Sequence, residues 1–258
     1  MTPAVTATDV VLGYGSRVVL ARSSFVIPSG TITAVIGPNG SGKSTLLNGI
    51  AGLIHPMAGS LDVPAQRSGA HRIAYVMQTT KVNDALPITV REVVAMGRFP
   101  DLGVRRFDGE DRESIDLAMD RTGIADVAGY HLSELSGGER QRVFVAQGLA
   151  QDHDILLLDE PLTGIDLTTA KSIDDVIHAE RDGGRTVILT THDLSEARVA
   201  DHVLLLSGRV VASGPPDRVL TDAHLLTAYG PSLLHVEPGG VIVDDPAHPH
   251  RGSHHERH

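Results

Sequence analysis

The octapeptide Gly37-Pro38-Asn39-Gly40-Ser41-Gly42-Lys43-Ser44 fits the pattern G-x-x-x-x-G-K-[ST]. An apolar run from Thr31 to Ile36 precedes it, and a helix is predicted from Lys43 to Ile50, which is the context that a phosphate site needs. Its glycines allow backbone N–H groups to surround phosphate oxygens at a helix N-terminus, where the dipole favours negative charge. We expect Lys43 to reach the β and γ phosphates of a nucleotide and Ser44 to bind Mg²⁺, with a chance glycine-rich turn as the alternative.

The composition is that of an ordinary globular protein. The chain has 258 residues, of which 41% are hydrophobic and 21% charged, enough for one large α/β domain with a subdomain. A formal net charge of -10 without a Lys/Arg run argues against nucleic-acid binding, and the absence of cysteine excludes disulfides and cysteine-ligated metal sites. Neither a secretory signal nor an apolar run of about 18 residues is present, so we expect a partner to supply any membrane spans.

Two kinds of β-structure are predicted. Val5 to Val11 and Val18 to Ile27 are β-branched and partly alternating around a glycine-containing turn, which favours an antiparallel region at the N-terminus. Ile155 to Leu158 and Thr186 to Thr191 are continuous runs typical of parallel strands buried on both faces. With late strands at Val203–Leu206 and Arg209–Ala212, the expected fold is α/β, with a mixed, mainly parallel sheet and an N-terminal antiparallel β subdomain.

The section 79–150 is predicted to be an inserted helical subdomain. Thr89 and the Glu three residues later form a potential capping box, and apolar residues continue at helical spacing to Gly97. A second helix is expected from Glu110 to Thr122, ending at Gly123, with Ile115, Ala118 and Met119 facing inward.

The C-terminal part is predicted to hold short helices, a hairpin and a tail. Short helices should follow Pro215-Pro216 as far as Tyr229, and Leu233 to Val243 suggests a hairpin around Pro238-Gly239-Gly240. We expect one folded unit over 1–243 and disorder over 244–258, which is rich in Pro and His. The histidines of that tail either bind zinc or are simply solvated.

A second motif, Ile155-Leu156-Leu157-Leu158-Asp159-Glu160, complements the phosphate loop. A buried strand would bring Asp159 to the edge of the site, where its carboxylate can hold Mg²⁺. Glu160 would then lie near the γ-phosphate, placed to orient or deprotonate water. An acidic turn after a strand is common, so the motif gains its meaning from the phosphate loop.

The pentapeptide Leu135-Ser136-Gly137-Gly138-Glu139, followed by Arg140-Gln141-Arg142, resembles the signature motif of ABC ATPases, whose usual last residue is Gln. Ser136 and Glu139 can also form a capping box at the start of a helix to Leu149. The two glycines, however, would each destabilise a helical interior by about 1 kcal/mol. They are better explained if a phosphate group must approach the backbone.

The resemblance covers Thr6 to Tyr229, and further family landmarks occur in the family's order. Tyr14 resembles the aromatic residue that stacks on adenine, and Gln78 the loop glutamine that senses Mg²⁺ and the attacking water. Asp166 resembles the aspartate of the loop that bridges two subunits, and His192 the histidine that contacts the γ-phosphate.

The resemblance implies an ATPase whose two copies form a head-to-tail dimer, each ATP being held by the phosphate loop of one chain and the signature motif of the other. The implied catalytic residues are Glu160, His192, Lys43 and Gln78, and the implied Mg²⁺-binding residues are Ser44, Gln78 and Asp159. The implied ATP-binding residues are Tyr14, Gly37, Pro38, Asn39, Gly40, Ser41, Gly42, Lys43, Ser44, Thr45, Ser136, Gly137, Gly138 and Asp166.

The pieces Leu86-Pro87-Ile88-Thr89-Val90 and Met96-Gly97-Arg98 resemble the ABC subgroup that energises uptake of zinc, manganese or iron chelates. This implies a peripheral subunit at the cytoplasmic face of the membrane, docked near 79–107 to a separate permease that works with an external substrate-binding protein. Importers of siderophores, haem or cobalamin share the second piece, and a single-domain ATPase of iron-sulfur cluster assembly is the other alternative.

Overall fold

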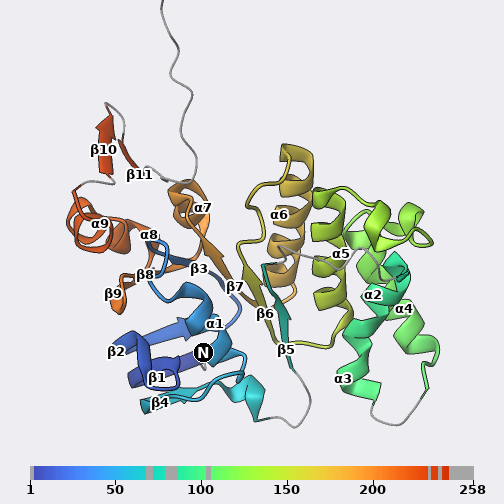
Figure 1. Ribbon diagram of the computed structural model, residues 1–258, viewed down its shortest axis with the longest axis horizontal. Coiled ribbons are helices and arrows are strands. Elements are labelled where there is room, and N and C mark those ends of the chain that lie inside the picture. Colours follow the sequence, from blue (N-terminus) through green and yellow to red (C-terminus); the bar gives the residue numbers. More distant parts are fainter. Residues whose placement is uncertain are drawn as a thin grey trace, which may run out of the picture.

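The computed structural model describes residues 3–67, 72–78, 87–102, 106–231, 234–237 and 240–243. Its centre is a six-stranded sheet in the order β5-β6-β7-β3-β8-β9 (Figure 1). Neighbouring strands run parallel except for the antiparallel pair β8 and β9. The carboxyl ends of β3, β5, β6 and β7 therefore meet at one edge. The strands are β3 Ile32–Ile36, β5 Ile73–Val76, β6 Ile155–Asp159, β7 Thr186–Thr191, β8 His202–Leu206 and β9 Val210–Gly214.

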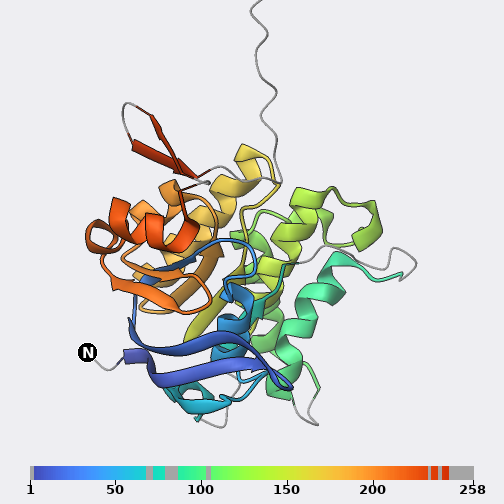
Figure 2. The ribbon, with the colours of Figure 1, turned by 60° about the vertical axis from the view of Figure 1, so that its left-hand side comes forward.

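A second, antiparallel sheet confirms the predicted N-terminal β region. It consists of β1 (Pro3–Tyr14), β2 (Arg17–Pro28) and β4 (Ala58–Asp62) in the order β2-β1-β4. Helix α1 (Lys43–Ile50) lies between the two sheets (Figure 2) and contributes buried Leu and Ile side chains to their shared core. Strand β4 was not predicted, because its sequence is poor in β-forming residues and it becomes a strand by pairing with β1.

The opposite face of the central sheet is covered by α6 (Leu167–Asp182), α7 (Leu194–Val199), α8 (Pro216–Val219) and α9 (Asp222–Tyr229). The strand β6 illustrates why the central strands are apolar throughout. Leu156 and Leu158 belong to the core on this face, whereas Ile155 and Leu157 belong to the core shared with α1. Burial on both faces explains the continuous hydrophobic runs.

The predicted helical section consists of α2 (Val90–Ala95), α3 (Phe99–Leu102), α4 (Gly109–Arg121) and α5 (Gly137–Ala150), and it has its own core. The capping box of α2 and the inward positions predicted for α4 are confirmed. The expected continuation of α2 to Gly97 is wrong, since the helix ends at Ala95 and a 3-10 turn follows. At Gly97 a Cβ atom would lie 2.1 Å from the carbonyl oxygen of Gln147, so close packing against α5 replaces the regular helix.

Beyond α9, β10 (Leu234–Glu237) and β11 (Gly240–Val243) form the predicted antiparallel hairpin. The first part of the predicted permease-docking segment, 79–86, and the His-rich tail, 244–258, lie outside the described residues. Within the described residues, every helix is too short or too polar to cross a membrane.

Candidate functional site

The phosphate loop joins β3 to α1 and is shaped by its glycines. Gly37, Gly40 and Gly42 all have positive φ angles, of 151°, 77° and 104°. At Gly37 a Cβ atom would also lie 2.2 Å from the carbonyl oxygen of Leu206, so only glycine fits between the loop and β8. The loop therefore has the tight backbone curve that anion binding by amide groups requires.

Lys43 is the first residue of α1 and is almost completely buried. Its Nζ donates a hydrogen bond of 2.9 Å to the carbonyl oxygen of Gly37, which holds the ammonium group over the loop. Ser44 follows with an exposed side chain, whereas Thr45 is buried. The loop thus offers a cation, a hydroxyl group and a helix N-terminus to a phosphate chain.

Asp159 ends β6 and Glu160 follows it, so the acidic pair lies at the carboxyl edge of the sheet. The buried Thr190 of β7 connects the two residues. Its Oγ1 donates to Asp159 Oδ1 at 2.6 Å and accepts from the backbone N–H of Glu160 at 2.8 Å. Sequence reasoning missed Thr190; the available signal was weak, because β7 also contains Thr186 and Thr191, and only its position two residues before His192 distinguishes Thr190.

The backbone of Glu160 is strained, and one of its carboxylate oxygens accepts a hydrogen bond. Its φ angle of 50° lies in the left-handed region, which is unusual for a residue other than glycine. Gln78 follows β5, and its Nε2 donates to Glu160 Oε2 at 2.9 Å. The structure therefore brings two of the predicted catalytic residues into direct contact, although they are far apart in the sequence.

Oxygen ligands suitable for Mg²⁺ are present around the same edge. Mg²⁺ prefers hard oxygen donors and usually combines one or two carboxylates with substrate phosphates. Asp159, Ser44 and the amide oxygen of Gln78 are such donors, and burial next to Asp159 raises the pKa of Tyr75, which stays protonated beside this carboxylate. Among the described residues, no three His, Cys, Asp or Glu side chains gather to hold a metal by themselves, so the donor set fits a cation shared with a nucleotide.

The two remaining predicted ATP contacts have different surroundings. His192 directly follows β7, which neighbours β3, and among the described residues its ring makes no hydrogen bond. Tyr14 is the last residue of β1 rather than a turn residue; it is 49% exposed, and its hydroxyl accepts a hydrogen bond of 2.8 Å from Asn48 of α1. Both side chains are accessible to a ligand.

The signature motif begins α5 and forms the predicted capping box. The backbone N–H of Ser136 donates to Glu139 Oε2 at 2.8 Å, and the N–H of Glu139 donates to Ser136 Oγ at 3.3 Å. Hydrogen bonds from Ser136 lower the pKa of Glu139. Since Glu and Gln both serve in this position of a capping box, the departure from the family's usual Gln leaves the local structure intact.

The two signature glycines have different neighbours. They lie in the first turn of α5 and not in its interior. A Cβ atom on Gly138 would lie 2.8 Å from Thr169 Oγ1 and 3.1 Å from Asp166 Oδ2, whereas a Cβ on Gly137 would meet no atom within 4 Å. Contacts within the chain thus explain why position 138 is a glycine. No such contact explains the glycine at position 137, where a group from outside the chain has room to approach.

Asp166 caps α6 and lies beside the signature motif. Its Oδ1 accepts from the N–H groups of Thr168 and Thr169 at 3.0 Å each, and the hydrogen bonds from Thr169 are the main cause of its lowered pKa. Among the described residues, no hydrogen bond joins Ser136–Gly138 to the phosphate loop.

Comparison with known proteins places these features in one family. A family model described as "ABC transporter" matches residues 20–163, more than half of the chain. The chelated iron transport system membrane protein YfeB of Yersinia pestis is 35% identical, covering 94% of this chain and 84% of that protein. The manganese transport system ATP-binding protein MntA of Synechocystis is 36% identical, covering 83% and 85%.

Among solved structures, one described as a metal-chelate type ABC transporter in an inward-facing conformation matches the fold with a TM-score of 0.79. It is 24% identical and covers 93% of this chain and 96% of its own. This likeness supports the α/β architecture, and the family model and the curated relatives identify the kind of protein. The chain belongs to the ABC transporter family, as an ATP-binding subunit with ATPase function that works with membrane components.

Proposed function

We propose that this subunit hydrolyses ATP to drive uptake of a metal ion, zinc or manganese, through a separate permease. The observation that carries the ATPase part is the shared edge of the sheet, where the phosphate loop, the acidic pair, Gln78 and His192 meet. The manganese and chelated-iron relatives support a metal substrate.

In this proposal the residues Gly37 to Thr45 hold the phosphates and Tyr14 stacks on adenine. Lys43 exchanges its bond to Gly37 for phosphate oxygens. Ser44, Gln78 and Asp159 would hold Mg²⁺, which would supply positive charge beside the phosphates. Glu160 orients and deprotonates the attacking water, and His192 contacts the γ-phosphate.

We further propose that two copies associate head to tail. The open space beside Gly137 favours a partner's γ-phosphate at that point, with Ser136 and Gly138 framing it and Asp166 bridging the subunits. Closure excludes water from both sites. Glu160→Gln should therefore bind ATP and accumulate as a closed dimer with little turnover, measured by size-exclusion chromatography with ATP. Normal hydrolysis by this variant would contradict the role of Glu160.

The surface next to Gln78 suits a permease. A cleft of about 370 Å³ lies between β5 and α5 and is lined by mainly apolar side chains, including those of Met77, Met96, Pro100 and Phe144. Met77 is 60% exposed and Met96 37%, and both line this cleft; exposed apolar side chains that gather at one place, unlike scattered ones, mark an interaction site. We propose that a helix of the permease occupies this cleft, which overlaps the predicted docking region 79–107 at Met96, Gly97 and Pro100, with this subunit at the cytoplasmic face of the membrane.

Reconstitution with the candidate permease and its external binding protein tests the substrate. Stimulation of ATPase activity by zinc or manganese, but not by siderophore, haem or cobalamin, is the expected result, and the reverse pattern would overturn the metal assignment. The iron-sulfur assembly alternative predicts that no permease co-purifies with the chain.

A further inference from the structure

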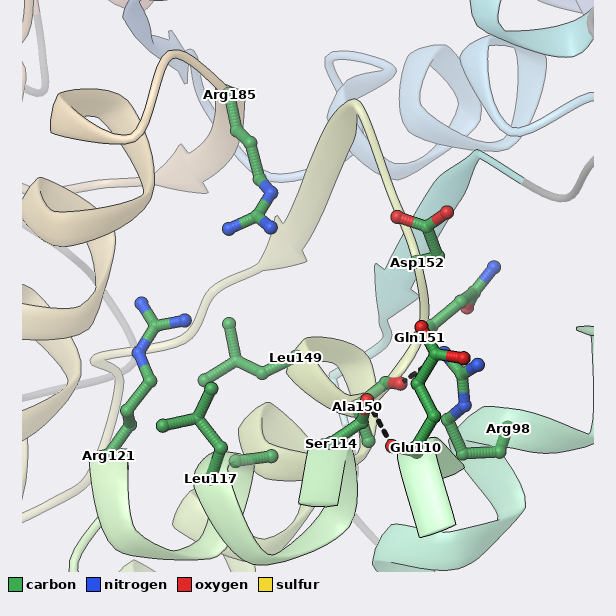
Figure 3. A pocket seen from close by; sticks show the side chains of 11 residues that line it. Arg98, Glu110, Ser114, Leu117, Arg121, Leu149, Ala150, Gln151, Asp152 and Arg185 are labelled. Atoms are coloured by element: carbon green, nitrogen blue, oxygen red, sulfur yellow. Dashed lines mark hydrogen bonds between the residues drawn. The ribbon is translucent and has the colours of Figure 1, made fainter. Parts of the chain in front are cut away.

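A polar pocket of about 350 Å³ lies at the end of the central sheet opposite to the phosphate loop, and Figure 3 shows the side chains that line it. It opens between the helical section and the central sheet, at the amino ends of β6 and β7: Asp152 precedes β6, and Arg185 precedes β7. The phosphate loop and acidic pair lie at the carboxyl ends of the strands. The pocket therefore serves no step of the proposed ATPase reaction.

Two arginines from different parts of the fold line this pocket and share one carboxylate. Arg121 Nη2 of α4 lies 2.6 Å from Glu180 Oε1, and Arg185 Nη1 lies 3.2 Å from Glu180 Oε2. Glu180 is completely buried, and His153 Nε2 lies 2.7 Å from the same Oε2 atom. Although burial favours its neutral form, the bonds from His153 and Arg121 hold the pKa of Glu180 at about 2, so it is charged at neutral pH.

The two guanidinium groups keep unused hydrogen-bonding capacity. Each guanidinium has five N–H donors, and the contacts to Glu180 engage only Nη2 of Arg121 and Nη1 of Arg185. Within the described residues, the other nitrogens of both groups have no hydrogen-bond partner. Figure 3 shows both side chains reaching into the same space from opposite sides. Glu180 balances one of these two guanidinium charges, so the pair itself keeps one positive charge, although Glu110 and Asp152 add negative charge elsewhere in the lining.

The rest of the lining limits what can bind. Leu117, which is 57% exposed, and Leu149 form an apolar wall beside the arginines. Glu110 and Asp152 line the pocket as well, and Asp152 is already paired with Arg72 at 3.2 Å. These carboxylates disfavour a long polyanion such as a nucleotide, whereas a compact oxyanion beside the arginines avoids them.

We propose that this pocket binds a compact oxyanion, a phosphate or small carboxylate group, between the guanidinium groups of Arg121 and Arg185. Guanidinium groups bind such anions through paired, charge-assisted hydrogen bonds. Because Arg121 belongs to the helical section and Arg185 directly precedes β7 of the central sheet, the anion bridges the two parts.

The chain contains no tryptophan, so Leu117→Trp introduces a single fluorescent reporter into the pocket wall. Titration of this variant with inorganic phosphate and, separately, with malonate should give a saturable change in indole fluorescence, and the stronger response identifies the chemistry. The reporter is remote from the phosphate loop and does not detect anions bound there. Potassium chloride at equal ionic strength controls for screening.

Arg185→Gln in the reporter background should weaken binding by about tenfold or more, the loss expected for charged hydrogen bonds. Arg121 and His153 continue to compensate Glu180 in this variant, and its thermal unfolding checks the fold. The matched control is Arg181→Gln, which removes a charge paired with Asp182 at 2.9 Å outside the pocket lining and should leave affinity unchanged. No saturable response, an equal response to chloride, or equal affinity in the Arg185 variant would overturn the proposal.

Discussion

Thr190→Val tests whether one buried hydroxyl group positions both acidic residues of the ATPase site. The variant keeps the shape of the side chain but removes the donor to Asp159 Oδ1 at 2.6 Å and the acceptor for the N–H of Glu160 at 2.8 Å. A hydrogen bond to a charged group contributes about 1.5–3 kcal/mol, and an unsatisfied buried N–H costs about 1–3 kcal/mol. Because the added methyl group offsets part of this loss, we expect the free energy of unfolding to fall by about 3 kcal/mol.

The effect on catalysis should exceed the effect on ATP binding. Without the bond to Thr190, Glu160 has less to hold its left-handed backbone, and a shift of about 1 Å in a catalytic group lowers turnover by about a hundredfold. Urea unfolding gives the stability, and ATPase assays give kcat and KM. We expect kcat to fall by about tenfold to a hundredfold with a small change in KM.

Thr186→Val is the matched control at the opposite end of the same strand. Thr186 is also buried, and its Oγ1 accepts from the N–H of Gly30 at 3.0 Å, remote from the acidic pair. It should lose about 1 kcal/mol of stability and keep normal turnover. Normal kcat in a destabilised Thr190→Val variant, or an equal loss of kcat in Thr186→Val, would refute the reasoning.

Three further predictions concern the signature helix and the buried Glu180. Gly137→Ala should leave thermal stability unchanged or slightly higher and should reduce ATP-dependent dimerisation. Gly138→Ala should lower the melting temperature, because its Cβ atom would meet Thr169 Oγ1 at 2.8 Å. Equal melting temperatures of the two variants would contradict this difference. Glu139→Gln should preserve the capping box and have a melting temperature close to wild type. It should form the ATP-bound dimer at lower ATP concentration, because it removes a negative charge near the partner's phosphate. Unchanged dimerisation would show that Glu139 does not lie close to the bound nucleotide. Because the pKa of Glu180 is lowered from 4.5 to about 2, its charge stabilises the fold above pH 4.5, and this contribution is lost as the pH falls toward 2. Urea unfolding between pH 3 and pH 6 should show a shallower pH dependence for Glu180→Gln, and an equal slope would contradict this origin.

Local sequence patterns predicted the parts of the fold that depend on local chemistry. The phosphate loop, the capping boxes at Thr89 and Ser136, and the buried strand before Asp159 are encoded in adjacent residues, and the structure has all of them. The resemblance to a family supplied Gln78 as a candidate, and the structure places it against Glu160.

The missed features depend on contacts between distant segments. Strand β4 exists through its pairing with β1, and the role of Thr190 follows from the register that places it opposite Asp159. The explanation for Gly138 lies in Thr169, a residue of another helix. No periodicity or motif reports such neighbours, because each is created only when the sheet and helices assemble.

The hydrogen bond between Gln78 and Glu160 has a consequence for ATP consumption in the cell. With the role proposed for Glu160, a lone subunit in the presence of abundant ATP has one oxygen of its catalytic base engaged by an amide group. Gln78 must move to release Oε2 of this carboxylate, and along the chain Gln78 adjoins the cleft proposed for the permease. We expect this contact to slow ATP hydrolysis by unassembled subunits compared with subunits engaged with a transporter.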